Sequence, residues 1–364
     1  MKINVLISYL EELVPLSSQE DYDNSGLLIG DSNSDLKSVL ITLDCTEEVV
    51  QEAIDKGCNL IIAHHPVIFK GIKSLTGSNY IERTILACVK KNIALYAIHT
   101  NLDNFRFGVN SEIADRLGLK NLKILEPKSG VLYKLVVFVP EAHHAVMSAA
   151  IFNAGAGDIG NYKECQFVTQ GIGTFKPTVG ANPFSGKIGE LSSDKELKAE
   201  FLVSSHRLRN VIKAMNDSHP YEEVAHDIFI LKNSNQNEGS GMIGELEVPM
   251  DESELLTKIK STFNSGIIRH TKLLNKPIKK VAFCGGSGSF LLKKAIAIKA
   301  DIFITADFKY HEFFDADKQI LIADIGHYES EQFTSNLLAA ILKQKFATFA
   351  VHLTGINTNP INYF

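Results

Sequence analysis

Short, predominantly apolar runs recur in both end regions of this chain. One of them, CNLIIA (58–63), follows a segment, Thr46–Asp55, that begins with a helix N-cap residue and is followed by Gly57, a helix stop signal. Uninterrupted apolar strands are typical of parallel sheets, which are buried on both faces. Strands of this kind that alternate with helices predict an α/β fold with helices on the faces of a parallel sheet.

The two end regions also resemble each other. AIDKGCNLIIAHHPVIFK (53–70) aligns with AIAIKADIFITADFKYHE (295–312), and each reads as a helix end, a buried strand and a polar loop. We therefore expect two similar α/β lobes. The strands expected in them are 38–43, 58–63, 93–98, 280–284, 301–305, 319–323 and 348–352, and the helices are 46–55, 80–90, 109–117, 290–299 and 330–345.

The segment between the lobes has a different pattern. Apart from one additional short strand in the middle, its strands and helices follow the order β-α-β-β-α-β, the ferredoxin-like α+β pattern. The expected strands are 133–140, 164–174, 186–191, 198–203 and 225–231, with helices at 141–154 and 205–216, and KNSNQNEGSG (232–241) reads as a polar linker. The predicted domains are a first lobe at 1–127, an inserted domain at 128–235 and a second lobe at 236–364.

Composition excludes several classes of protein. The 364 residues suit two or three domains, and the formal net charge of -5 provides no basic footprint for nucleic acid. The sequence contains no run of about 18 apolar residues, so no membrane span is expected. The five cysteines are scattered singly, which indicates buried thiols in a reducing compartment, and the N-terminus does not resemble a signal peptide. We expect a cytoplasmic protein.

Histidine and carboxylate side chains follow three of the predicted strands. In open α/β sheets, ligands bind at the carboxyl ends of strands. Imidazoles and carboxylates together suit zinc, iron or manganese, and a carboxylate can bridge two ions. Taken singly, each of these residues could equally be a polar loop residue, whereas the three loops together favour a metal site. The side chains are His64 and His65, then His99 and Asp103, then His327 and Glu331, the last two spaced to share one helix face.

Other polar residues suggest supporting roles. His99 and Asp324 could orient the ligands or be structural, and His311 in KYHEFF is a candidate proton carrier. GGSGS (285–289) could cradle a phosphate with its backbone amides, but a tight turn is the better interpretation because it does not fit G-x-G-x-x-G.

Seven strings of this sequence resemble the NIF-three-like family, the GTP cyclohydrolase I type 2 homologues, over essentially the whole chain. Two departures are Tyr22, where the family commonly has Trp, and Ala306, which stands in a usual Thr-Gly-Asp string. The middle is similar to the PII-like and CutA-like insert of the longer bacterial members, through GIGTFKPTVGANPFSG (171–186) and HPYEEVAHDI (219–228). The seven strings are DYDNSGLLIG (21–30), IIAHHPVIFKGIKSL (61–75), AIHTNLDNFRFGVN (97–110), VAFCGGSGSFL (281–291), IFITADFKYHEFFDA (302–316), DIGHYESE (324–331) and NTNP (357–360).

The resemblance implies a function and an assembly. It implies two divalent ions held by His64, His65, Asp103, His327 and Glu331, and a homohexamer built as a toroid of trimers. One hypothesis is a metal-dependent hydrolase of a nucleotide-type substrate, with GTP suggested by the family name and with His99 or His311 moving a proton. The alternative is a non-catalytic regulatory or metal-handling assembly that senses a small molecule through the insert.

Overall fold

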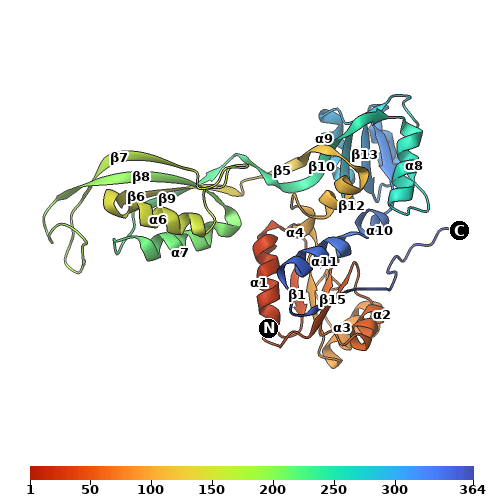
Figure 1. The fold of residues 1–364 in the computed structure, drawn as a ribbon, viewed down its shortest axis with the longest axis horizontal. Coiled ribbons are helices and arrows are strands. Elements are labelled where there is room, and N and C mark those ends of the chain that lie inside the picture. The colour runs from red at the N-terminus through yellow and green to blue at the C-terminus, as the bar shows by residue number, and fades with distance from the viewer. The chain divides into compact units, whose positions relative to one another are not determined.

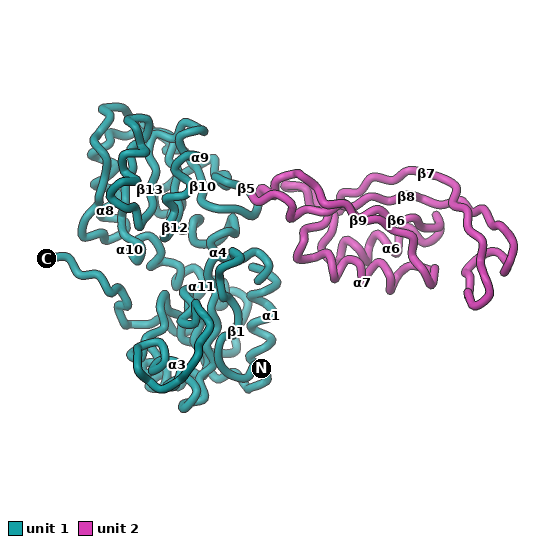
Figure 2. Tube along the Cα trace, turned by 180° about the vertical axis from the view of Figure 1, so that it is seen from behind, with its two compact units in different colours: residues 1–127, 237–364 teal, residues 128–236 magenta.

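The computed structural model describes residues 1–364 as a mixed α/β protein with several sheets. Contacts divide the chain into two compact units, drawn in different colours in Figure 2. The first unit combines Met1–Pro127 with Asn237–Phe364, and the second is Lys128–Gln236. No helix is long and apolar enough to cross a membrane.

The first sheet of the first unit has the order β1-β4-β3-β2-β15. Its neighbours are parallel except for β1, which pairs antiparallel with β4. Helices α2 and α3 pack on one face, and α1 and α11 pack on the other, so the central strands are buried on both sides. The elements are α1 (Ile3–Leu13), β1 (Gly26–Ile29), β2 (Ser38–Thr42), α2 (Glu47–Asp55), β3 (Leu60–Ala63), α3 (Tyr80–Lys90), β4 (Ala94–Ala97), α11 (Thr334–Lys345) and β15 (Ala350–Leu353).

The second sheet has the order β11-β14-β13-β12-β10-β5, with β12, β13 and β14 parallel. Helices α5 and α8 cover one face, and α9 lies on the other (Figure 1). The strands are β5 (Lys120–Ser129), β10 (Ser234–Met250), β11 (Arg269–His270), β12 (Ile278–Ser287), β13 (Ile302–Ala306) and β14 (Leu321–Asp324). The helices are α4 (Thr100–Asp103), α5 (Val109–Leu117), α8 (Glu252–Thr262), α9 (Leu292–Ala297) and α10 (His327–Glu331), with short 3-10 turns η1 (Leu16–Ser18), η3 (Ser289–Leu291) and η4 (Tyr310–Ala316).

Three features of the first unit differ from the sequence prediction. The polar segment 232–241, predicted as a linker, lies largely in β10, because backbone pairing with neighbouring strands does not require apolar side chains. The helix predicted over 330–345 is two helices, since α10 ends at Glu331 and α11 begins at Thr334. Strand β15 follows the second lobe in sequence, but it pairs with β2 in the first sheet.

The second unit is a four-stranded antiparallel sheet of order β7-β8-β6-β9. Helices α6 and α7 lie side by side on one face (Figure 1), and Met147 and Met215 from them pack against Phe201 of the sheet. The strand predicted at 186–191 is wrong: this segment is part of the loop between β7 and β8, with left-handed backbone at Gly186 and Gly189. The elements are β6 (Leu132–Pro140), α6 (Glu141–Asn153), β7 (Gln166–Phe175), β8 (Ser192–Ser204), η2 (Ser205–Arg207), α7 (Leu208–Ser218) and β9 (His226–Leu231).

The separate cores generate a prediction about the inserted segment. Every residue of the core cluster around Phe201 lies in the second unit, and the other four clusters contain none of its residues. Joining Pro127 to Glu238 by a short polar linker should therefore leave a remaining unit that unfolds in one cooperative thermal transition. Circular dichroism would measure this transition. Loss of the transition in the deleted protein would show that the first unit depends on the insert.

Candidate metal centre

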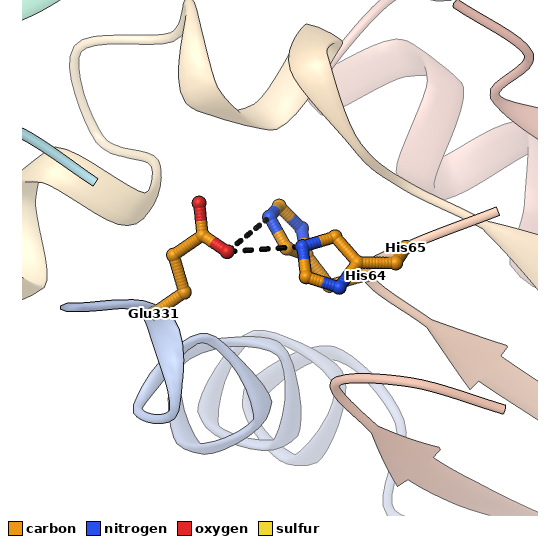
Figure 3. A group of neighbouring side chains, drawn as sticks. All are labelled: His64, His65 and Glu331. Atoms are coloured by element: carbon orange, nitrogen blue, oxygen red, sulfur yellow. Dashed lines mark hydrogen bonds and ion pairs between the residues drawn. The ribbon is translucent and has the colours of Figure 1, made fainter. Parts of the chain in front are cut away.

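The predicted ligands lie on loops and turns that follow strands of both sheets in the first unit. His64 and His65 come directly after β3, and Asp103 ends the short helix α4 that follows β4. His327 and Glu331 begin and end α10, which follows β14 of the second sheet. In Figure 3 the two imidazoles after β3 point toward the Glu331 carboxylate. The site therefore forms where strand ends of the two sheets meet.

One oxygen of Glu331 lies at the centre of this group. Glu331 Oε2 is 2.9 Å from His65 Nε2, 3.1 Å from His327 Nε2 and 4.0 Å from His64 Nε2. The Nε2 atoms of His65 and His327 are 3.4 Å apart, and His64 Nε2 is 3.5 Å from Asp103 Oδ1. All five predicted ligands are thus gathered, and three of them, His64, His65 and Glu331, have ligand atoms within 4.8 Å of one another.

Each of the three imidazoles is oriented by a hydrogen bond at its other nitrogen. His64 Nδ1 lies 2.8 Å from the carbonyl oxygen of Ile98, which can only accept a hydrogen bond. His65 Nδ1 is 2.7 Å from Asp44, and His327 Nδ1 is 2.7 Å from Asp307. Such bonds place the proton on Nδ1 and aim Nε2 at the centre, as carboxylates and carbonyls do behind metal-binding histidines.

Sequence reasoning missed Asp44 and Asp307 as supporting residues. Asp307 comes directly after β13, and Asp44 is separated from the end of β2 by one residue. The rule that located the histidines, polar residues at strand ends, would also have found these two aspartates. The prediction did not include these aspartates because neither has a histidine beside it in the sequence.

The electrostatics of the cluster depend on Glu331, which is only 3% exposed. Burial disfavours its charge, but His327 and His65 outweigh burial and hold its pKa well below the ordinary value. Glu331 in turn is the largest cause that raises the pKa of His327, to about 11. Burial opposes a charge on His65, yet Asp44 and Glu331 prevail and raise its pKa to about 10. The positive charge of these two rings and the negative charge of Glu331 therefore stabilise one another.

The other two predicted ligands behave differently. Burial lowers the pKa of His64 to about 3, so its ring is neutral, and burial followed by the charge of Glu331 raises the pKa of Asp103. His64 Nε2 and Asp103 Oδ1 are buried and have no hydrogen-bond partner, which is costly for polar atoms. An imidazole nitrogen and a carboxylate oxygen are both ligands that divalent metals such as zinc accept, and these two atoms lie 3.5 Å apart. The residues present therefore fit a divalent metal ion.

Glycines at the end of β12 give Glu331 its space. A Cβ atom at Gly286, where φ is +59°, would lie 2.2 Å from Glu331 Oε1. The amide of Gly285 donates to Asn110 Oδ1, and the amide of Gly286 donates to Ser330 Oγ. Because these amides are already bonded within the chain, the GGSGS string (285–289) acts here as a close-approach turn and not as a phosphate cradle.

The remaining candidates divide into two groups. The ring of His99 lies 5.4 Å from the rings of both His64 and His65, and its Nδ1 is 2.7 Å from Asp23. His99 also lines a pocket of about 400 Å³ together with Asp103, His327 and Glu331. Asp324 accepts hydrogen bonds from the Phe308 and Gly326 amides, so it holds the backbone next to Asp307 and His327.

His311 does not line this pocket. Its ring is exposed and contacts only the rings of Tyr310 and Phe314 on η4. The proton-carrier role predicted for His311 has no support from this geometry, because the 3-10 turn η4 presents the ring to solvent.

Comparison with known proteins places this geometry in a family. The sequence model described as Duf34/NIF3 (NGG1p interacting factor 3) matches residues 1–360. A Staphylococcus epidermidis protein named GTP cyclohydrolase 1 type 2 homolog is 38% identical over 100% of both chains, and one of the same name from Halalkalibacterium halodurans is 40% identical over 98% of both. The crystal structure of a Bacillus cereus protein related to NIF3 matches with a TM-score of 0.87 and 36% identity, covering 100% of this chain and 99% of that one. The chain belongs to the Duf34/NIF3 family.

Proposed function

We propose that this protein is a metal-dependent hydrolase that uses two divalent ions, zinc, iron or manganese, on a nucleotide-type substrate. The observation that carries the proposal is the gathering of three imidazoles around Glu331 Oε2, with Asp103 beside His64 and with every imidazole anchored at Nδ1. The relatives' name, GTP cyclohydrolase 1 type 2 homolog, supports the choice of substrate class.

Each side chain has a distinct part in such a site. Glu331 Oε2 lies within 4.0 Å of three imidazole nitrogens, so it would hold metal together with these histidines. His64 and Asp103 supply the two buried atoms that lack partners. When bound, the ions would polarise a substrate oxygen and lower the pKa of water.

His99 is the group we assign to proton transfer. Its Nδ1 is engaged by Asp23, which also accepts a hydrogen bond from the Thr100 amide and is therefore held firmly. This leaves Nε2 as the nitrogen that can accept or pass a proton. The pocket that His99 lines, about 400 Å³, is of a size that holds a small molecule.

The alternative function is a regulatory or metal-handling assembly. The observation that favours it is the second unit, which has a complete core of its own and contributes no residue to the metal cluster.

We infer that this unit is a ferredoxin-like domain of the PII-like and CutA-like kind, because its order of strands, β7-β8-β6-β9, joins two β-α-β halves. We also propose a homohexamer, because the family resemblance implies a toroid of trimers and closed symmetry is usual for homo-oligomers.

Removal of one carboxylate tests the ligand set. Glu331→Ala and Asp103→Ala should each lose at least one metal ion per chain, because each change removes a charge that a neutral imidazole does not supply. Elemental analysis of the purified proteins measures this, with circular dichroism to verify folding. Full metal content in a folded Glu331→Ala protein would contradict the assignment.

A pair of glycine substitutions separates metal loss from backbone strain. Gly286→Ala places a methyl group against Glu331 Oε1, whereas Gly57→Ala introduces the same left-handed alanine where nothing lies within 4 Å. Both variants should lose about 1 kcal/mol of unfolding free energy from backbone strain. Only Gly286→Ala should also bind metal more weakly, as measured by competition with a chelator. Equal metal affinity in the two variants would mean that the position of Glu331 is unimportant.

Hydrolysis is tested by incubating the metal-loaded protein with a panel of nucleotides that includes GTP, and by following the products chromatographically. We expect turnover that disappears on chelation and in both His65→Ala and His327→Ala. Because these residues act as one unit, the double variant should be no worse than either single variant. Turnover that survives chelation and both substitutions would mark a contaminant. Absence of turnover in fully loaded protein would favour the regulatory alternative.

A further inference from the structure

Two sequence strings of the insert line a single pocket in the second unit. Strand β7 and the loop after it carry GIGTFKPTVGANPFSG (171–186), and the segment after α7 carries HPYEEVAHDI (219–228). Residues of both strings, together with Glu196 of β8, enclose a pocket of about 370 Å³. Its lining residues lie at the end of β7, in the first part of the loop that joins β7 to β8, on β8 and in the segment after α7. The metal centre has no part in this pocket, so the inference is independent of the proposed hydrolysis.

Aromatic rings form one side of the pocket. The ring of Tyr221 lies 6.3 Å from that of Phe175 and 5.8 Å from that of Phe184. Phe184 is 55% exposed, although its ring lies beside the ring of Tyr221 and 5.3 Å from the ring of His143. The face of an aromatic ring carries partial negative charge, so rings grouped around a pocket favour a cation.

A buried carboxylate lies beside these rings. Glu196 is 8% exposed, and its Oε1 accepts a hydrogen bond of 2.9 Å from the Tyr221 hydroxyl. Its other oxygen, Oε2, lies against Gly173, where a Cβ atom would come within 2.1 Å of it. Glu196 forms no ion pair. A largely buried carboxylate whose side-chain partner is a neutral hydroxyl favours a positively charged group beside it.

The other charges of the pocket have the same sign. Glu222 and Glu223 line it as well, and neither forms an ion pair, although Glu222 accepts a hydrogen bond from the Asn182 amide. Lys176 is the one basic residue in the lining. Three carboxylates against one ammonium group would repel a phosphate, so the pocket is unsuited to a nucleotide.

The arrangement also disfavours a metal ion. The carboxylate oxygens of the pocket do not converge as metal ligands do, since the group that meets that condition is His64, His65 and Glu331 in the first unit. An uncharged apolar ligand would leave Glu196 without its counter-charge. We propose that this pocket binds an organic cation, an alkylammonium or guanidinium group, with Glu196 as counter-charge and Phe175, Phe184 and Tyr221 as its aromatic walls.

Calorimetric titration of the full-length protein tests the proposal, with choline chloride and butylguanidinium chloride as probes. We expect saturable binding of at least one probe, with one site per chain. Glu196→Gln keeps the shape of the side chain and removes its charge, so it should weaken binding about tenfold or more. Phe184 is exposed, so the Phe184→Leu protein should fold normally. It should bind the probe about threefold more weakly, because the aromatic ring face is lost.

The matched control is Glu200→Gln on the same strand, β8. Glu200 forms ion pairs with Lys134 and Lys198 and does not line the pocket, so its loss should leave binding unchanged. The proposal is overturned if the unmodified protein binds neither cation at millimolar concentration, or if both Glu196→Gln and Phe184→Leu bind as tightly as it does. It is also overturned if magnesium chloride or AMP, titrated in parallel, binds and loses affinity in Glu196→Gln, because the pocket would then have another ligand.

Discussion

The buried carboxylate of Glu331 is the interaction on which the first unit depends most. It comes from α10 beside the second sheet, and it meets imidazoles that follow β3 of the first sheet. A carboxylate so far from solvent is stabilised by the positive charge of His65 and His327, and a metal ion held by the same imidazoles would supply that charge in place of their protons. The site and the junction between the two sheets are therefore one structure, and a change that disturbs either should disturb both.

The C-terminal segment reinforces this junction. Helix α11 packs on the core of the first sheet and β15 extends that sheet, so the chain returns to the first lobe after completing the second. Beyond β15, Thr358 donates a hydrogen bond of 2.8 Å to Asp44, the residue that orients His65. Asn359 then contacts the buried Glu329 on α10. The NTNP string (357–360) thus connects the supports of His65 to the helix that carries Glu331 and His327.

The second unit shows a different use of buried charge. Glu331 has cationic partners within the chain, whereas Glu196 has a tyrosine hydroxyl and aromatic neighbours but no cation. This contrast suggests that two kinds of positive ligand are served by one polypeptide, inorganic ions in the first unit and an organic ion in the second.

Much of the local structure was determined by the sequence itself. The helices at 80–90 and 109–117 have the predicted limits, because capping residues and apolar spacing act within a few residues of one another. The i, i+4 spacing of His327 and Glu331 likewise predicted that the two side chains would meet on one helix face. Strand-end histidines and carboxylates, together with the family resemblance, indicated the members of the cluster.

Only the tertiary structure decided how these parts combine. The pairing of β15 with β2, and the inclusion of a polar segment in β10, depend on backbone partners far away in the sequence, which side-chain patterns do not encode. The strand-end rule could have listed Asp44 and Asp307 as polar residues, but only the structure shows which histidines their carboxylates orient, 21 and 20 positions away. The sequence determined which side chains could bind a cation, but their charges and pKa values arise from burial and from neighbours that folding alone brings together.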